Sequence, residues 1–174
     1  MGISPILLPY ILLFLLGVSE VSDFLDGYLA RKRKEVTDLG KILDPMADSI
    51  YRISVFLTFT LDPIRLPMLL IFMFIYRDSC ISTLRTVCAM KGYTLAARKS
   101  GKLKALIQAL AAFTVIVLMI PHSIGKLSTH TLQSTSAWIV GFAAVYTLVS
   151  GIEYLVANRF YIRQVLTKGK DARL

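Results

Sequence analysis

The amino-acid sequence predicts an all-α, polytopic integral membrane protein, a bundle of about five transmembrane helices. Hydrophobic residues make up 55% of the 174 residues and the mean hydropathy is +0.63, more apolar than a typical soluble domain. Each of five apolar runs is long enough to cross a hydrocarbon core about 30 Å thick. Together the runs use most of the chain, so we expect a single transmembrane domain over residues 1–174.

The basic residues lie in alternate connections between these runs. Connections 31–41, 91–104 and 158–174 are rich in Lys and Arg, whereas 62–67 and 121–130 carry one Arg and one Lys. This alternation follows the positive-inside rule and places the three basic connections at the cytoplasmic face. The formal net charge of +9 therefore indicates contact with anionic membrane lipids, and we expect no nucleic-acid partner.

The apolar runs predict helices at about residues 3–31, 39–61, 68–90, 100–120 and 131–157. The first run has no basic segment before it, so we interpret it as a retained helix rather than a cleaved signal peptide. Pro45 is expected to bend the second helix, and Pro121 is expected to end the fourth.

Four carboxylates lie where the first predicted helix ends and the second begins. Asp23 and Asp26 are three residues apart, and Asp44 and Asp48 are four apart, so each pair projects from one helix face. Converging carboxylates near hydrocarbon repel one another unless a cation binds between them. Ligands that are all oxygen favour hard ions, so this stretch predicts a site for Mg²⁺ or Mn²⁺, with enough carboxylates for two ions.

Purely structural roles remain open for each acid taken alone. Asp44 before Pro45 also fits a helix N-cap followed by proline at the first helical position. The first carboxylate pair also fits ordinary ion pairs with Arg31 or Arg52.

Three small residues, Gly27, Ala30 and Gly40, lie beside the acids. They suit close approach of a flat base or a phosphate to the backbone, but they equally suit tight packing between membrane helices. The acids and small residues together form one pattern, Asp23-x2-Asp26-Gly27-x2-Ala30-Arg31-x8-Gly40-x3-Asp44-x3-Asp48. Through this pattern the chain resembles the CDP-alcohol phosphatidyltransferase family.

The resemblance implies a phospholipid-synthesising transferase that uses CDP-diacylglycerol. It implies two divalent ions, Mg²⁺ or Mn²⁺, bound by Asp23, Asp26, Asp44 and Asp48, with Asp48 also the general base. It implies that the CDP moiety is bound by Gly27, Ala30, Arg31 and Gly40. It further implies a homodimer and usually six spans, so we expect this chain to lack the first helix of the family.

Charged residues also interrupt the third predicted helix. Arg77, Asp78 and Arg85 stand in an apolar run and are expected to face the bundle interior or a watery cavity. With Lys102 or Lys104, the two arginines suit a doubly charged phosphate. The two lysines also fit simple snorkelling to the cytoplasmic surface.

A second resemblance concerns the acceptor alcohol. The elements Arg77-Asp78, Ser82, Leu84-Arg85, Gly101-Lys102-x-Lys104 and Gln108 resemble the pattern of the glycerol-3-phosphate phosphatidyltransferases, the phosphatidylglycerophosphate synthases, with Asp78 where Glu is more usual. This implies transfer of a phosphatidyl group from CDP-diacylglycerol to glycerol 3-phosphate, with release of CMP. The site would lie at the cytoplasmic face of an inner or plasma membrane if the source is bacterial.

Three alternatives stay open at this point. The acceptor alcohol could be inositol phosphate, serine or another alcohol. The acids could form the transport site of a small divalent-cation carrier. The chain could also be a catalytically inactive homologue or a fragment.

Overall fold

The computed structural model describes residues 4, 6–33, 38–93, 95 and 98–168, and within α-helices it leaves the side chains of residues 23–24, 26–33, 38–45 and 166–168 undescribed. The described ranges are all helical, without strands, which confirms the predicted fold class. The helices are α1 (Leu8–Arg33), α2 (Asp38–Thr58), α3 (Met68–Met90), α4 (Lys99–Ser123), α5 (Thr129–Ala157) and α6 (Arg159–Lys168).

The five long helices correspond to the predicted ones, with three differences. Helix α4 continues through Pro121 to Ser123, so the prediction that Pro121 ends it is wrong. The fixed φ of proline is compatible with a helix, and α4 continues for only two residues after Pro121. Helix α2 begins at Asp38, so Asp44 and Pro45 lie inside it and Asp44 is no N-cap. The basic tail was expected to be a connection, but it forms helix α6.

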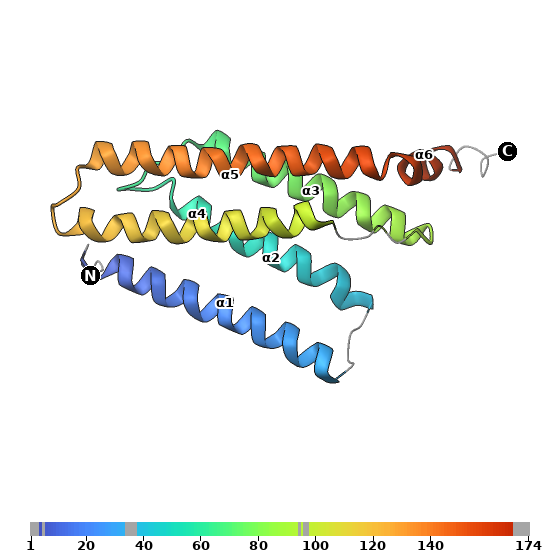
Figure 1. Ribbon diagram of the computed structural model, residues 1–174, viewed down its shortest axis with the longest axis horizontal. Helices are drawn as coiled ribbons and strands as arrows, with labels where there is room; N and C mark the ends of the chain where they lie inside the picture. Colours follow the sequence, from blue (N-terminus) through green and yellow to red (C-terminus); the bar gives the residue numbers. More distant parts are fainter. Residues whose placement is uncertain (1–3, 5, 34–37, 94, 96–97, 169–174) are drawn as a thin grey trace.

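The five long helices run alternately up and down the bundle (Figure 1). Helix α5 packs against α3 and α4, α4 also packs against α1, and α2 contacts both α3 and α4. The end of α1, the start of α2, the α3–α4 connection and α6 all lie toward one end of the molecule (Figure 1). The described parts of the three basic stretches therefore belong to the same end.

The interior is packed with aromatic and branched side chains from four helices. Phe56 of α2 contacts Phe74 of α3 with ring centroids 4.8 Å apart, and both rings are almost fully buried. Val115 of α4 and Val140 of α5 are completely buried beside them in the same cluster. These helices therefore share one hydrophobic core.

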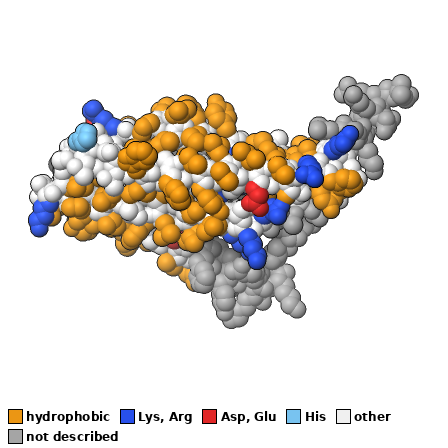
Figure 2. All heavy atoms as spheres, turned by 45° about the horizontal axis from the view of Figure 1, so that its top comes forward, with side chains coloured by type: hydrophobic (Ala, Val, Ile, Leu, Met, Phe, Trp, Pro, Cys, Tyr) orange, Lys and Arg blue, Asp and Glu red, His pale blue; other side chains and the backbone are white. Residues whose placement is uncertain are grey.

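The outer surface is also apolar, unlike that of a soluble bundle. Trp138, Phe142 and Leu69 expose 80%, 67% and 71% of their surfaces. Orange hydrophobic side chains cover most of the visible face, and Lys and Arg gather toward its ends (Figure 2). Helices α4 and α5 are each long and apolar enough to span a bilayer, and α1 contains a shorter apolar segment, Leu8–Ser22. These features are those of a membrane helical bundle.

Candidate functional site

The backbone places the four predicted metal acids on two consecutive helices. Asp23 and Asp26 lie in the C-terminal part of α1, and Asp44 and Asp48 lie in the N-terminal half of α2. The side chains of Asp23, Asp26 and Asp44 lie outside the described residues. So do those of the residues expected to bind the CDP moiety, which are Gly27, Ala30, Arg31 and Gly40. Both sets of residues remain predictions.

Asp48 is the one predicted metal acid whose side chain is described. Arg52, one turn further along α2, donates a hydrogen bond from Nη2 to Asp48 Oδ2 over 3.2 Å. The sequence suggested Arg52 as a partner of the first carboxylate pair, and the structure shows it bonded to an acid of the second pair. The Asp48 side chain is 48% exposed, so its carboxylate remains accessible from outside the protein.

The donor chemistry of these residues fits a hard divalent cation. All four candidate ligands are carboxylates, and the Asp48 side chain is accessible beside Arg52. Among the described side chains, no three His, Cys, Asp or Glu residues gather, but that set includes only one of the four acids. The grouping of the four carboxylates around a metal ion remains a prediction.

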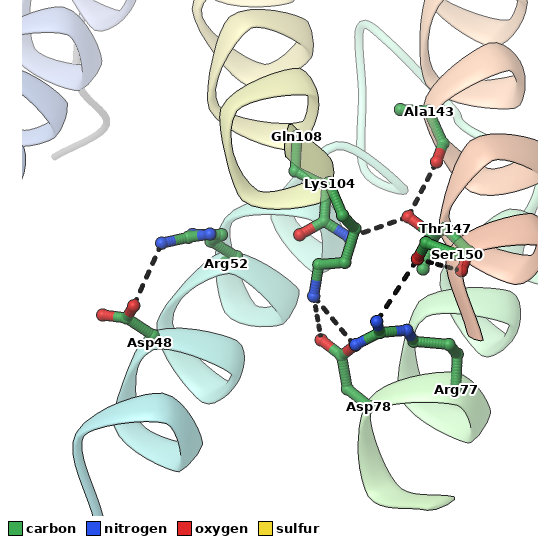
Figure 3. Close-up of polar contacts among 9 residues, drawn as sticks. All are labelled: Asp48, Arg52, Arg77, Asp78, Lys104, Gln108, Ala143, Thr147 and Ser150. Atoms are coloured by element: carbon green, nitrogen blue, oxygen red, sulfur yellow. Dashed lines mark hydrogen bonds and ion pairs between the residues drawn. The ribbon is translucent and has the colours of Figure 1, made fainter. Parts of the chain in front are cut away.

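A second polar cluster lies inside the bundle and is centred on Asp78 of α3 (Figure 3). Lys104 Nζ of α4 donates to both Asp78 carboxylate oxygens, each at 2.8 Å. Arg77 Nη1 contacts Asp78 Oδ1 at 3.0 Å. Asp78 and Lys104 are 7% and 5% exposed, so this is a buried network in which two cations share one carboxylate. It therefore carries a net positive charge.

Helix α5 completes the surroundings of Arg77. Ser150 Oγ accepts a hydrogen bond from Arg77 Nη2 at 3.2 Å and donates one to the Thr147 carbonyl oxygen at 2.8 Å. The backbone of Gly151 lies so close to Arg77 that an added Cβ would come within 2.8 Å of Arg77 Cγ. Thr147 Oγ1 also accepts a hydrogen bond from Gln108 Nε2 of α4 at 3.1 Å.

Arg85 lies two turns beyond Arg77 on α3 and also contacts α5. Its Nε donates to the Tyr154 hydroxyl at 3.1 Å, and its guanidinium carbon lies 5.1 Å from the centre of the Tyr154 ring. Such contacts combine a hydrogen bond with a cation–π interaction. Tyr154 is only 2% exposed, so it offers a rigid surface to the arginine.

The structure therefore brings together two of the four residues predicted to bind the acceptor phosphate, and it places a third two turns away along the same helix. Arg77 and Lys104 share Asp78, and Arg85 lies further along α3. The fourth, Lys102, is exposed two residues before the buried Lys104. The prediction that the α3 charges face the bundle interior is confirmed for Asp78 and Arg77, whose side chains are 7% and 11% exposed.

Sequence reasoning missed the contribution of α5. Ser150, Gly151 and Tyr154 lie in a helix of otherwise lipid-like composition, and small or hydroxyl-bearing residues there are usually explained by helix packing. The available signal was their spacing, which puts polar and small residues on one face near the C-terminal end of α5.

Comparison with known proteins bears on the same region. The family model for CDP-alcohol phosphatidyltransferase matches residues 8–150. A CDP-diacylglycerol–glycerol-3-phosphate 3-phosphatidyltransferase of Bacillus subtilis is 31% identical over 141 residues, covering 81% of this chain and 69% of the relative. A protein of the same name from Rickettsia typhi is 31% identical over 152 residues, covering 86% and 80%.

A more partial relative carries a different name. The cardiolipin synthase (CMP-forming) of Streptomyces coelicolor is 36% identical over 81 residues, which are 47% of this chain and 37% of that protein. The family model spans most of the chain, including both carboxylate pairs and the Asp78 cluster. The chain thus belongs to the CDP-alcohol phosphatidyltransferase family, whose members are membrane-bound transferases.

Proposed function

We propose that the protein transfers a phosphatidyl group from CDP-diacylglycerol to sn-glycerol 3-phosphate, forming phosphatidylglycerophosphate and releasing CMP. The observation that carries this proposal is the buried cluster of Arg77, Asp78 and Lys104, with the part-buried Arg85 two turns further along α3, because these cations suit an acceptor that bears a phosphate. The names of the relatives from Bacillus subtilis and Rickettsia typhi support the same reaction.

The charge of this cluster matches its proposed ligand. Arg77, Lys104 and Arg85 carry three positive formal charges against the one negative charge of Asp78, and this surplus is opposite in sign and about equal in size to the charge of a phosphate monoester at neutral pH. Asp78 offsets part of the charge when no ligand is bound and holds Arg77 and Lys104 in place. Lys102 is exposed nearby along α4 and would help attract the anion from the cytoplasm.

The carboxylates of α1 and α2 would hold the second part of the reaction centre. Two divalent ions, Mg²⁺ or Mn²⁺, would be bound by Asp23, Asp26, Asp44 and Asp48 and would neutralise the diphosphate of the donor. The residues expected to line the CDP moiety follow from the family pattern: Gly27, Ala30, Arg31 and Gly40. The lipid tails would remain in the bilayer beside the apolar outer surface.

Asp48 would act as the general base. It would take the proton from the acceptor hydroxyl, whose oxygen then attacks the β-phosphorus of CDP-diacylglycerol. The new bond joins the acceptor oxygen to that phosphorus, and the bond to the leaving CMP breaks. Arg52 would orient the Asp48 carboxylate before the acceptor binds. The arginines of α3 contribute rate by holding the acceptor in line.

An acceptor panel tests this proposal. Purified protein would be given CDP-diacylglycerol and Mg²⁺ with glycerol 3-phosphate, inositol phosphate, serine or glycerol, and both CMP and the lipid product would be measured. We expect turnover with glycerol 3-phosphate and none with serine or glycerol. Product identification by mass is needed because one partial relative is named as a cardiolipin synthase. CMP release with inositol phosphate but not glycerol 3-phosphate would contradict the assignment.

The location and assembly of the site are further parts of the proposal. The site would face the cytoplasm, because the basic connections share one end of the bundle with the carboxylate-bearing helix ends. Residues 1–174 would form a single transmembrane domain that functions as a homodimer, as the family resemblance suggests. Light scattering of the detergent-solubilised protein would test the dimer. A divalent-cation carrier is disfavoured, because its acids should lie near the middle of the membrane.

A further inference from the structure

We propose that one turn of α5, residues 150–154, positions both arginines of α3 and thereby sets the affinity for the phosphate of the acceptor. This turn contributes no group to the predicted metal or CDP sites. Its role as a positioning element rests on the proposed function, since it acts through Arg77 and Arg85.

The contact of Gly151 with Arg77 is the closest part of this arrangement. A Cβ at position 151 would lie 2.8 Å from Arg77 Cγ and 3.5 Å from Arg77 Nε, so any larger residue would displace the arginine stem. The absence of a side chain at this position therefore lets Arg77 run directly along the backbone of α5. The other glycine of the same helix, Gly141, has nothing within 4 Å of its Cβ position. The close approach to a neighbouring side chain is therefore particular to Gly151.

Two hydroxyl groups then orient the guanidinium groups. Ser150 accepts from Arg77 Nη2 at 3.2 Å, and its own hydrogen is directed to the Thr147 carbonyl oxygen, so its lone pairs face the arginine. Tyr154 accepts from Arg85 Nε at 3.1 Å and lies beside the same guanidinium group. Because these hydroxyls accept from the arginines, the cationic groups keep their charge and their remaining N–H donors for an anion.

A single turn of α5 thus contacts two groups that are eight residues, about 12 Å, apart on α3. Helices α3 and α5 run in the same direction, so the earlier arginine meets Ser150 and Gly151 and the later one meets Tyr154. One rigid element consequently fixes the relative placement of both cations. Preorganised charges bind an anion without further loss of side-chain freedom, which is why position matters as much as charge.

Two substitutions with matched controls test the proposal. Gly151→Ala displaces the Arg77 stem, and Gly141→Ala makes the same change where the space is open. Tyr154→Phe removes only the hydroxyl that accepts from Arg85, and Tyr146→Phe repeats this on the same helix at a tyrosine with no hydrogen bond to it among the described residues. If Gly151→Ala fails to fold, the Tyr154→Phe pair decides the question.

The expected result is a selective change in acceptor binding. Gly151→Ala and Tyr154→Phe should each raise KM for glycerol 3-phosphate about tenfold, the value for one lost charge-assisted hydrogen bond, while KM for CDP-diacylglycerol is unchanged. Adding Gly151→Ala to Arg77→Ala should raise KM no further, because the glycine acts only through that arginine. Equal changes in both KM values, or fully additive effects with Arg77→Ala, would overturn the proposal.

A binding measurement separates this inference from the proposed reaction. Inorganic phosphate should raise the Tm of the wild-type protein and of both controls, and it should raise the Tm of Gly151→Ala and Tyr154→Phe much less. If the wild-type protein is inactive with glycerol 3-phosphate but shows this pattern, the proposed reaction fails and the positioning role stands. If phosphate stabilises all variants equally, the positioning role fails.

Discussion

Asn in place of Asp78 should destabilise the protein strongly. Asp78 is 7% exposed. Its carboxylate accepts from Lys104 Nζ, which lies 2.8 Å from both oxygens, and from Arg77 Nη1 at 3.0 Å. Asp78→Asn preserves the shape of the side chain but leaves two cations in a buried site with no counter-charge. Breaking a buried pair in this way costs about 3–5 kcal/mol.

This cost corresponds to a large shift in thermal stability. For a chain of this size, each kcal/mol lowers Tm by about 2–4 °C, so we expect a fall of roughly 10 °C for Asp78→Asn. The assay is thermal unfolding of detergent-solubilised protein, in which the fraction of protein that remains monodisperse is measured after heating to each temperature. Asp62→Asn is the matched control, because Asp62 pairs with Arg65 in the exposed α2–α3 connection.

A compensating substitution sharpens the test. Adding Lys104→Met to Asp78→Asn removes one of the two uncompensated cations and should recover part of the lost Tm, because an apolar side chain replaces a buried charge. The reasoning would be refuted if Asp78→Asn lowered Tm no more than Asp62→Asn does. That outcome would mean that water or another group solvates Arg77 and Lys104 without Asp78.

Three further predictions concern catalysis, metal and pH. Asp48→Asn should lower kcat by about 10²–10⁴, the usual contribution of a general base, and CMP release at the full rate would contradict this role. Treatment with EDTA should abolish CMP release, and Mg²⁺ or Mn²⁺ but not Ca²⁺ should restore it, which a radiolabelled-lipid assay would follow. The hydrogen bond from Arg65 lowers the pKa of Asp62 from its ordinary value of 3.8, so this exposed pair stabilises the folded state above that pH and ceases to do so as the carboxylate is protonated. The small Tm difference between wild type and Asp62→Asn should therefore be largest at neutral pH and vanish in acid. A Tm difference that grows in acid would contradict the lowered pKa of Asp62.

The sequence predicted the helical framework well because its signals are local. Apolar run length and proline position are properties of neighbouring residues, and they placed α2, α3 and α5 to within a few residues. The errors were also local. Pro121 was expected to end α4, yet the fixed φ of proline is compatible with a helix, and α4 continues for two more residues. Helix α6 was missed because a short basic segment lacks a long apolar run.

In the candidate site, too, the sequence determined local features and the tertiary structure determined the contacts between helices. By itself the sequence determined the membrane class, the carboxylate pattern at Asp23–Asp48 and the presence of cations in α3, since spacing of three or four residues defines a helix face. Only the tertiary structure decided which helix that face meets. It paired Asp78 with Lys104 of α4 and set Arg77 against Gly151 of α5, contacts that join residues 26 and 74 positions apart. Such contacts depend on how helices are rotated and packed, which helical periodicity leaves undetermined.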